Sequence, residues 1–308
     1  MSFVIKSTTE RAEVWGRQFA EHLPDIPFRI WPDIGDPAEV EYLATWVPPE
    51  DLVERFPNLK VLFSVGAGID QFDLAAIPPH IKIVRMIETG LTEGMVAYVQ
   101  FAVRAIQRDM LRYASQQRAH VWQAYPVREA ARFRVGVMGL GQLGVPVACA
   151  LRDMGYVAQG WARSAREIDK VQCFADEDGL RAFLASTDIL ICLLPLTAET
   201  TGILNHDLFA QLPRGASLVQ CGRGRHLVTD DLIAALDSGQ LASAILDVTD
   251  PEPLPADHPL WDRTDVLITP HIASMTPTES GGMAIVENIR RYRNGEAPVG
   301  LVDRRTGY

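Results

Sequence analysis

Residues 134–144 read RVGVMGLGQLG, an apolar segment that runs directly into the pattern GxGxxG. A strand is predicted before the glycines, over residues 134–138, and a helix after them, over residues 142–154. In this setting the first glycine allows a tight turn, the second lets a pyrophosphate approach the backbone, and the third lets the helix pack against the strand. The helix N-terminus adds unpaired N–H groups and the positive end of its dipole. The segment therefore predicts a dinucleotide-binding turn with contacts from Gly139, Gly141, Gln142, Leu143 and Gly144.

The end of the next predicted strand, residues 157–161, indicates which dinucleotide binds. Units that bind NAD carry an acidic residue about 18 positions after the last glycine, where it accepts a hydrogen bond from the ribose 2′-OH. Here that position is Ala162, and Arg163, Ser164 and Arg166 follow. A guanidinium can hold a 2′-phosphate by charge-assisted hydrogen bonds. We therefore expect NADP(H) as the preferred cofactor, with NAD(H) also possible; the alternative is a solvated pair of surface arginines.

Short β-type segments alternate with helical segments along the whole chain, which is typical of doubly wound α/β domains with parallel sheets. The length of 308 residues fits two domains of about 100–200 residues each. The predicted strands cover residues 3–6, 27–30, 42–46, 61–65 and 81–85 in the first half, and 134–138, 157–161, 188–193, 217–220, 243–247 and 265–269 in the second. Helices are expected at residues 9–22, 50–56 and 278–294.

The strongest helical pattern covers residues 92–117 and predicts one long helix. Its apolar residues recur at helical spacing, at Val99, Val103, Ile106, Met110 and Tyr113. Such a helix can connect two lobes and also form a dimer interface, although packing within one subunit explains the stripe equally well.

Charge and cysteine content limit the classes of partner. Lys and Arg total 29 and Asp and Glu total 39, so the formal net charge is −10, which disfavours nucleic acid and anionic membranes as partners. The four cysteines form no CxxC pair, and the chain starts without the apolar segment of a signal peptide. No two histidines have metal-ligand spacing, so we predict no metal. These features favour a soluble cytoplasmic protein with reduced thiols.

Three segments each place a chemically useful side chain just after a predicted strand. They are VQCGRG at 219–224, LDVTDPEPLP at 246–255 and ITPHIA at 268–273, and they supply Arg223, Glu252 and His271. Parallel strands end at the same edge of a sheet, where open α/β sheets bind their ligands, so these side chains are expected to converge. Taken singly, Arg223 also fits a surface arginine, Glu252 a loop carboxylate and His271 a structural histidine.

With these segments in order, the chain resembles the D-isomer-specific 2-hydroxyacid dehydrogenase family. Further segments carry the resemblance: VGAGID at 65–70, ETGLTEGM at 88–95, LLPLTAETTGILN at 193–205 and VDRRTGY at 302–308. The resemblance implies a Rossmann nucleotide-binding domain, residues 99–276, inserted into a flavodoxin-like substrate-binding domain made of residues 1–98 and 277–308. Within the family, the likeness is greatest to the glyoxylate/hydroxypyruvate reductases.

The resemblance also implies roles for particular residues. The family's catalytic Arg, Glu and His fall on Arg223, Glu252 and His271. A histidine can donate the proton that the substrate oxygen needs, a neighbouring carboxylate stabilises the charged ring, and a guanidinium can hold the substrate carboxylate. Where the family often has Asn-x-Ala-Arg-Gly, this chain has QCGRG at 220–224, so the lining of the pocket differs. Further cofactor contacts are implied for Leu194, Pro195, Thr197, Cys221, Gly222, Asp247 and Ala273.

In the first lobe, the resemblance assigns the substrate carboxylate to the glycine turn at Val65, Gly66 and Ala67. Trp46 matches an aromatic residue that narrows the substrate site, which favours small acids. The expected activity is therefore NADPH-dependent reduction of glyoxylate or hydroxypyruvate to the D-2-hydroxy acid, by a homodimer with a cleft between its lobes. A reductase of larger or aryl 2-keto acids, or a dinucleotide-sensing interaction protein on the same fold, are the alternatives.

Overall fold

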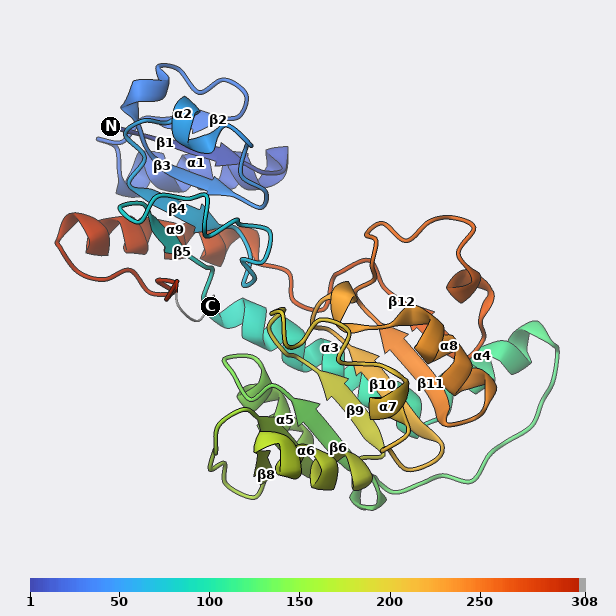
Figure 1. Cartoon of the computed structure of the whole chain (residues 1–308). Helices are drawn as coiled ribbons and strands as arrows, with labels where there is room; N and C mark the ends of the chain where they lie inside the picture. Colours follow the sequence, from blue (N-terminus) through green and yellow to red (C-terminus); the bar gives the residue numbers. More distant parts are fainter. Residues whose placement is uncertain (305–308) are drawn as a thin grey trace. The chain divides into compact units, whose positions relative to one another are not determined.

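The computed structural model describes residues 1–304 and divides into two α/β units (Figure 1). The first unit consists of Met1–Leu91 and the chain from Met275 onward, and the second unit is Thr92–Ser274. Both divisions fall a few residues before those expected at 98/99 and 276/277. The last residues of the VDRRTGY segment, 305–308, lie outside the described part of the chain.

The first unit is built on a five-stranded parallel sheet in the order β2-β1-β3-β4-β5. This is the flavodoxin-like order, with its switch point between β1 and β3. Side chains alternate between two covered faces: Phe3 and Ile5 pack with α1 and α9, whereas Val4 packs with α2. The elements are β1 (Ser2–Lys6), α1 (Thr9–His22), β2 (Phe28–Ile30), η1 (Pro37–Glu39), β3 (Val40–Thr45), α2 (Leu52–Arg55), β4 (Val61–Ser64), β5 (Lys82–Val84) and α9 (Thr278–Arg293).

Helix α9 completes this unit from the far end of the chain. The indole Nε1 of Trp15 on α1 donates to the carbonyl of Thr278 at 2.7 Å. A Cβ on Gly282 would lie 2.6 Å from the Trp15 ring, so the glycine is needed for the two helices to approach. The expected helix at residues 278–294 is therefore present, and it packs against the N-terminal helix.

The second unit contains a seven-stranded parallel sheet in the order β12-β11-β10-β9-β6-β7-β8. Counted from β6, the order is that of a Rossmann sheet with one further strand at the β12 edge, and the switch point lies between β6 and β9. The fold class predicted from the sequence is confirmed. The strands are β6 (Arg134–Met138), β7 (Val157–Ala162), β8 (Gln172–Ala175), β9 (Ile189–Cys192), β10 (Ala216–Gln220), β11 (Leu241–Leu246) and β12 (Val266–Ile268).

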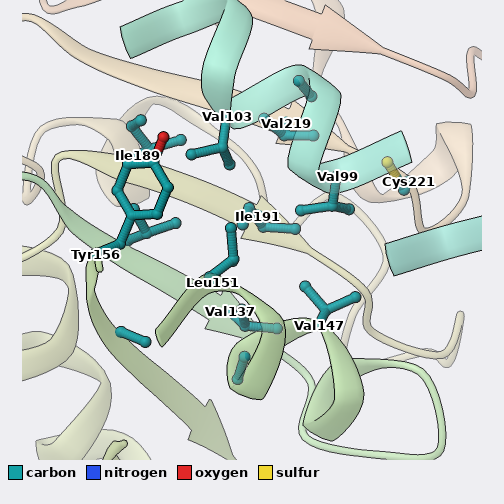
Figure 2. Packing of buried hydrophobic residues seen from close by; sticks show 14 of the residues in the cluster. Val99, Val103, Val137, Val147, Leu151, Tyr156, Ile189, Ile191, Val219 and Cys221 are labelled. Carbon is teal, nitrogen blue, oxygen red and sulfur yellow. The ribbon is translucent and has the colours of Figure 1, made fainter. Parts of the chain in front are cut away.

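Helices cover both faces of this sheet. Residues of α3 and α5 pack on one face, where Val99 and Val103 of α3 lie over Ile189 and Ile191 of β9 (Figure 2). Residues of α6, α7 and α8 pack on the other face. The helices of the second unit are α3, which begins before the division (Thr89–Gln107), α4 (Met110–Arg118), η2 (Ala130–Arg132), α5 (Gly144–Asp153), α6 (Asp176–Ala185), α7 (His206–Phe209), η3 (Gly224–His226), α8 (Thr229–Asp237) and η4 (Pro259–Asp262).

Two sequence expectations about this unit are wrong. The helix predicted over residues 92–117 is two helices, because Asp109 adopts a left-handed conformation with φ 52° and breaks the backbone ladder between α3 and α4. After the break the apolar stripe no longer faces the core, and Met110 is 51 % exposed. Strand β8 was not predicted; it is a short edge strand without a fully buried residue, so its sequence carries little periodic signal.

Candidate active site

The glycine turn after β6 has the geometry that its sequence predicts. Gly139 has φ 103°, and a Cβ there would lie 2.7 Å from the carbonyl oxygen of Leu193. A Cβ on Gly144 would lie 1.8 Å from the carbonyl oxygen of Gly139, so only glycine fits at the start of α5. Nothing lies within 4 Å of the Cβ position of Gly141, which leaves its backbone open to a ligand. Gln142 and Leu143 precede α5 instead of forming its first turn.

The residues expected to choose the dinucleotide follow β7. Arg163, Ser164 and Arg166 are all exposed. The hydrogen bond from Thr197, and to a smaller extent the charge of Arg163, lower the pKa of Glu199. Glu199 belongs to the loop after β9, and its charge interacts with that of Arg163 after β7.

Arg223 lies on a turn that is held by hydrogen bonds from the Gln220 side chain. The Gln220 side chain is fully buried at the end of β10; it donates to the carbonyl of Arg223 at 2.9 Å and accepts from the N–H of Gly222 at 3.1 Å. A Cβ on Gly224 would lie 1.9 Å from the carbonyl oxygen of Thr249, so this turn packs directly on the loop after β11. The Gln220 side chain therefore holds the backbone of the two residues that follow Cys221.

His226 holds the same turn from its other end. Its ring is fully buried, and Nδ1 lies 2.9 Å from the backbone nitrogen of Arg223 while Nε2 lies 3.2 Å from the carbonyl oxygen of Pro195. Pro195 and the neighbouring Leu194 belong to the loop after β9, where cofactor contacts are expected. His226 therefore connects that loop with the turn that carries Arg223.

His271 and Glu252, which the sequence analysis expects to converge, lie within hydrogen-bond distance of each other. Nδ1 of His271 lies 2.9 Å from Oε2 of Glu252, and the two side chains are 34 % and 39 % exposed. The other oxygen of Glu252 accepts from the N–H of Thr249 at 3.1 Å. Nδ1 is thus the ring nitrogen that faces the carboxylate, and Nε2 is the one that does not.

Asp247 holds the segment that carries His271. This carboxylate is 2 % exposed; one oxygen accepts from the Thr269 hydroxyl at 2.6 Å and the Ile272 N–H at 2.8 Å, and the other accepts from the Ala273 N–H at 2.8 Å. His271 between them has φ 55°, a left-handed conformation that costs a residue with a side chain about 1–2 kcal/mol. Asp247 and Ala273 were both expected as cofactor contacts, and the Ala273 N–H donates to the Asp247 carboxylate.

Thr269 extends this network to α3. Its hydroxyl has one proton, which it gives to Asp247, so the Tyr98 hydroxyl 2.6 Å away donates to Thr269. Burial raises the pKa of Tyr98, which keeps that hydroxyl protonated and able to donate. Burial also raises the pKa of the Cys221 thiol beside the Arg223 turn. The cysteine is thus a neutral packing residue.

The substrate residues expected in the first unit lie together. A Cβ on Gly66 would lie 2.7 Å from the Trp46 ring, so the indole packs directly over the turn. Within the unit, the N–H of Val65 donates to Thr45 at 3.2 Å and that of Gly66 donates to the Ser64 hydroxyl at 3.2 Å. Any carboxylate bound by these two N–H groups has to replace those bonds. Ala67 follows them on the same turn.

Sequence reasoning missed Gln220, His226, Thr269 and Tyr98. Gln220 and Thr269 lie inside predicted site segments and His226 lies two residues after one, so their positions gave a signal, but their contacts depend on which strands are neighbours. Within residues 1–304, no group of three or more His, Cys, Asp or Glu side chains could hold a metal ion. In the same residues, no helix has the length and apolar character needed to cross a membrane.

Comparisons with known proteins agree with this geometry. Residues 101–273 match the model of the D-isomer specific 2-hydroxyacid dehydrogenase NAD binding domain. The chain is 38% identical over 303 residues to glyoxylate/hydroxypyruvate reductase A of Yersinia enterocolitica, covering 96% of each protein. A D-isomer specific 2-hydroxyacid dehydrogenase of Xanthobacter autotrophicus Py2, solved with NADPH and MES, matches with 38% identity and a TM-score of 0.94 over 100% of this chain and 99% of that one.

An NADPH-dependent glyoxylate/hydroxypyruvate reductase of Sinorhizobium meliloti, solved with NADP and sulfate, matches with 34% identity and a TM-score of 0.92 over the full length of both chains. Family model, relatives and structures thus agree on one assignment, which is the one that the sequence motifs predict. The chain belongs to the D-isomer specific 2-hydroxyacid dehydrogenase family of oxidoreductases.

Proposed function

We propose that the protein reduces small 2-keto acids, with glyoxylate and hydroxypyruvate as leading substrates, to D-2-hydroxy acids with NADPH. The observation that carries this proposal is the His271–Glu252 pair at 2.9 Å on the loops after β12 and β11. The names of the relatives from Yersinia enterocolitica and Sinorhizobium meliloti support the substrates. The four free cysteines fit a reducing, cytoplasmic location.

The residues present fit a dinucleotide. A Cβ would be blocked by backbone at Gly139 and Gly144, whereas Gly141 is open, which is the arrangement that a pyrophosphate needs. Arg163 and Arg166 would hold a 2′-phosphate, and the NADPH- and NADP-bound relatives favour the same nucleotide. When bound, the nicotinamide supplies the hydride. Leu194, Pro195 and Thr197 are proposed to cover the adenosine side of the cofactor, and Cys221 and Gly222 to be further cofactor contacts.

The reaction then needs a proton on the carbonyl oxygen and a cation for the substrate carboxylate. We assign the proton to Nε2 of His271, because Nδ1 is bonded to Glu252. Glu252 orients the ring and balances its positive charge, so it acts through His271. Arg223 is assigned to the carboxylate, and its guanidinium donates to the carbonyl of Gly222 at 2.8 Å, which limits how far it can turn. General acid catalysis of this kind contributes about 10²–10⁴-fold to the rate.

In the first unit, we assign carboxylate binding to the turn of Val65, Gly66 and Ala67, and the limit on substrate size to Trp46. The Trp46 side chain is 38 % exposed and lies against the Gly66 backbone, which limits the movement of its ring. A wall of this kind excludes aryl-pyruvates.

We also propose a homodimer. Large apolar side chains are exposed along one continuous part of the second unit: Phe101 on α3 is 55 % exposed, Met110 begins α4, and Trp122 after α4 is fully exposed. Large apolar side chains that are exposed in a monomer and gather into one surface patch mark an interface. A second copy of the chain would cover them by two-fold symmetry. Trp122→Asp should shift sedimentation from dimer to monomer, and an unchanged sedimentation coefficient would contradict the proposal.

The activity is tested by following NADPH and NADH oxidation at 340 nm against glyoxylate, hydroxypyruvate, pyruvate and phenylpyruvate. We expect the first two to give the highest kcat/KM, with NADPH preferred. A preference for phenylpyruvate would assign the protein to the aryl 2-keto acid reductases. Binding of NADPH without turnover of any keto acid would favour a sensor on the same fold.

A further inference from the structure

We infer that His226 is a positioning residue that ties the cofactor-binding loop after β9 to the turn that carries Arg223, through a neutral ring protonated at Nε2. The inference rests on the proposed function for its kinetic consequences, while the form of the ring follows from contacts within the second unit alone. His226 is not expected to touch the substrate or the cofactor.

The protonation state follows from the two partners of the ring. A backbone N–H can only donate, so Nδ1, 2.9 Å from the Arg223 nitrogen, has to accept and carries no proton. A carbonyl oxygen can only accept, so Nε2, 3.2 Å from the Pro195 oxygen, has to carry the proton. A ring protonated at Nδ1, whether neutral or charged, would put two donors against each other at Arg223.

The surroundings hold the ring in this orientation. A Cβ on Gly222 would lie 2.7 Å from Nδ1 and 3.3 Å from the carbonyl oxygen of Leu194, so the glycine backbone forms one side of the ring's cavity. The backbone N–H of His226 returns to the carbonyl of Arg223 at 3.0 Å. Because the side chain is fully buried, both ring bonds form without competition from water.

The two bonds act on different parts of the proposed reaction. The Nδ1 bond fixes the backbone at Arg223, which sets where its guanidinium starts. The Nε2 bond fixes Pro195, in the loop assigned to the cofactor. A single buried ring thus sets the spacing between substrate-binding and cofactor-binding segments that are 28 residues apart in sequence, as the numbers of Pro195 and Arg223 give.

Two substitutions separate these roles. In His226→Asn, the amide oxygen can replace Nδ1 as acceptor, but the side chain is too short to reach Pro195. In His226→Gln, the amide nitrogen can replace Nε2 as donor, but the acceptor for Arg223 is lost. We expect His226→Asn to weaken NADPH binding, measured by fluorescence titration, about fivefold with little change in kcat. We expect His226→Gln to lower kcat about fivefold with little change in NADPH binding.

Gln240→Ala is the matched control. The Gln240 side chain donates to the carbonyls of Phe209 at 2.8 Å and Leu212 at 2.9 Å. Gln240 is in the same unit but just before β11, so it lies at the amino-terminal ends of the strands, away from the site. It should lower the thermal midpoint as the His226 variants do, with kcat and NADPH binding unchanged. Equal effects of both His226 variants on both quantities, or effects no larger than those of Gln240→Ala, would overturn the inference.

The ring itself is tested without any ligand. In protein labelled with ¹⁵N-histidine, the signal of the buried ring should have the shifts of a neutral, Nε2-protonated imidazole at pH 7, and it should be absent in His226→Asn. A ring protonated at Nδ1 would overturn the inference. This measurement does not depend on turnover, so it separates failure of the inference from failure of the proposed reductase activity.

Discussion

Asp247→Asn tests the network that holds His271. The carboxylate accepts three hydrogen bonds, from the Thr269 hydroxyl and from the backbone N–H groups of Ile272 and Ala273. An asparagine oxygen can keep the first two. Its amide nitrogen then faces the Ala273 N–H, where the native distance is 2.8 Å, so two donors meet in a buried place.

The expected cost follows from these contacts. One hydrogen bond to a charged group, worth about 1.5–3 kcal/mol, is lost, and the Ala273 N–H is left unsatisfied. Ala273 is 1 % exposed, so water does not replace the hydrogen bond that its N–H loses. Since part of the penalty is shared between these two effects, we expect a total of about 2–4 kcal/mol. This exceeds the strain of about 1–2 kcal/mol in the left-handed His271 backbone, so the segment should open locally.

Hydrogen exchange measured on peptides that cover residues 268–275 reports this opening directly, and kcat reports its effect on His271. We expect faster exchange in this segment and a lower kcat. Asp188→Asn is the matched control, because Asp188 also accepts three hydrogen bonds, all from Arg134. Asp188 precedes β9, so it lies at the amino-terminal ends of the strands, away from His271. Asp188→Asn should lose less stability, because the Asp188 side chain is 26 % exposed and water can replace part of its bonding, and it should keep its kcat. Native exchange and native kcat in Asp247→Asn would refute the reasoning.

Further predictions concern single residues. His271→Asn should lower kcat by about 10²–10⁴-fold without loss of stability, since asparagine tolerates the left-handed backbone; near-native turnover would reassign the acid. Arg163→Ala should raise the KM for NADPH and spare that for NADH, whereas equal changes would remove the 2′-phosphate argument. Burial raises the pKa of Cys192 to about 12 from 9.0, so the unfolded chain ionises first and stability falls as pH rises through this range, by about 1 kcal/mol per unit. Cys192→Ala should flatten that slope in urea titrations at pH 8 to 10.5; an unchanged slope would contradict the assignment.

The sequence predicts the two sheets well because buried parallel strands are continuous apolar segments bounded by turns. Residues 134–138 and 189–192 are examples. Glycines at positions where a Cβ would clash with backbone, such as Gly144, mark the turn between strand and helix. It does not predict the break at Asp109, because an aspartate inside a helical pattern is compatible with a helix and its left-handed backbone depends on tertiary packing.

The chemistry of the site was accessible through short motifs, but the residues that support it were not. Arg223, Glu252 and His271 each follow a strand, so the rule about carboxyl ends of parallel strands brings them together. His226 bonds to Pro195, 31 residues away in sequence, and Tyr98 bonds to Thr269, 171 residues away. Periodicity and spacing contain no information about such pairs.

The docking of α9 on α1 has a consequence for biosynthesis. Trp15 and Gln18 are translated 263 and 261 residues before their hydrogen-bond partners, Thr278 and Glu279. Meanwhile the second unit, one uninterrupted stretch of chain, is already complete. Residues 1–91 therefore keep the Trp15 indole uncovered until α9 has been translated and released. A ribosome that stops before residue 275 leaves a finished nucleotide-binding unit attached to an unfinished partner.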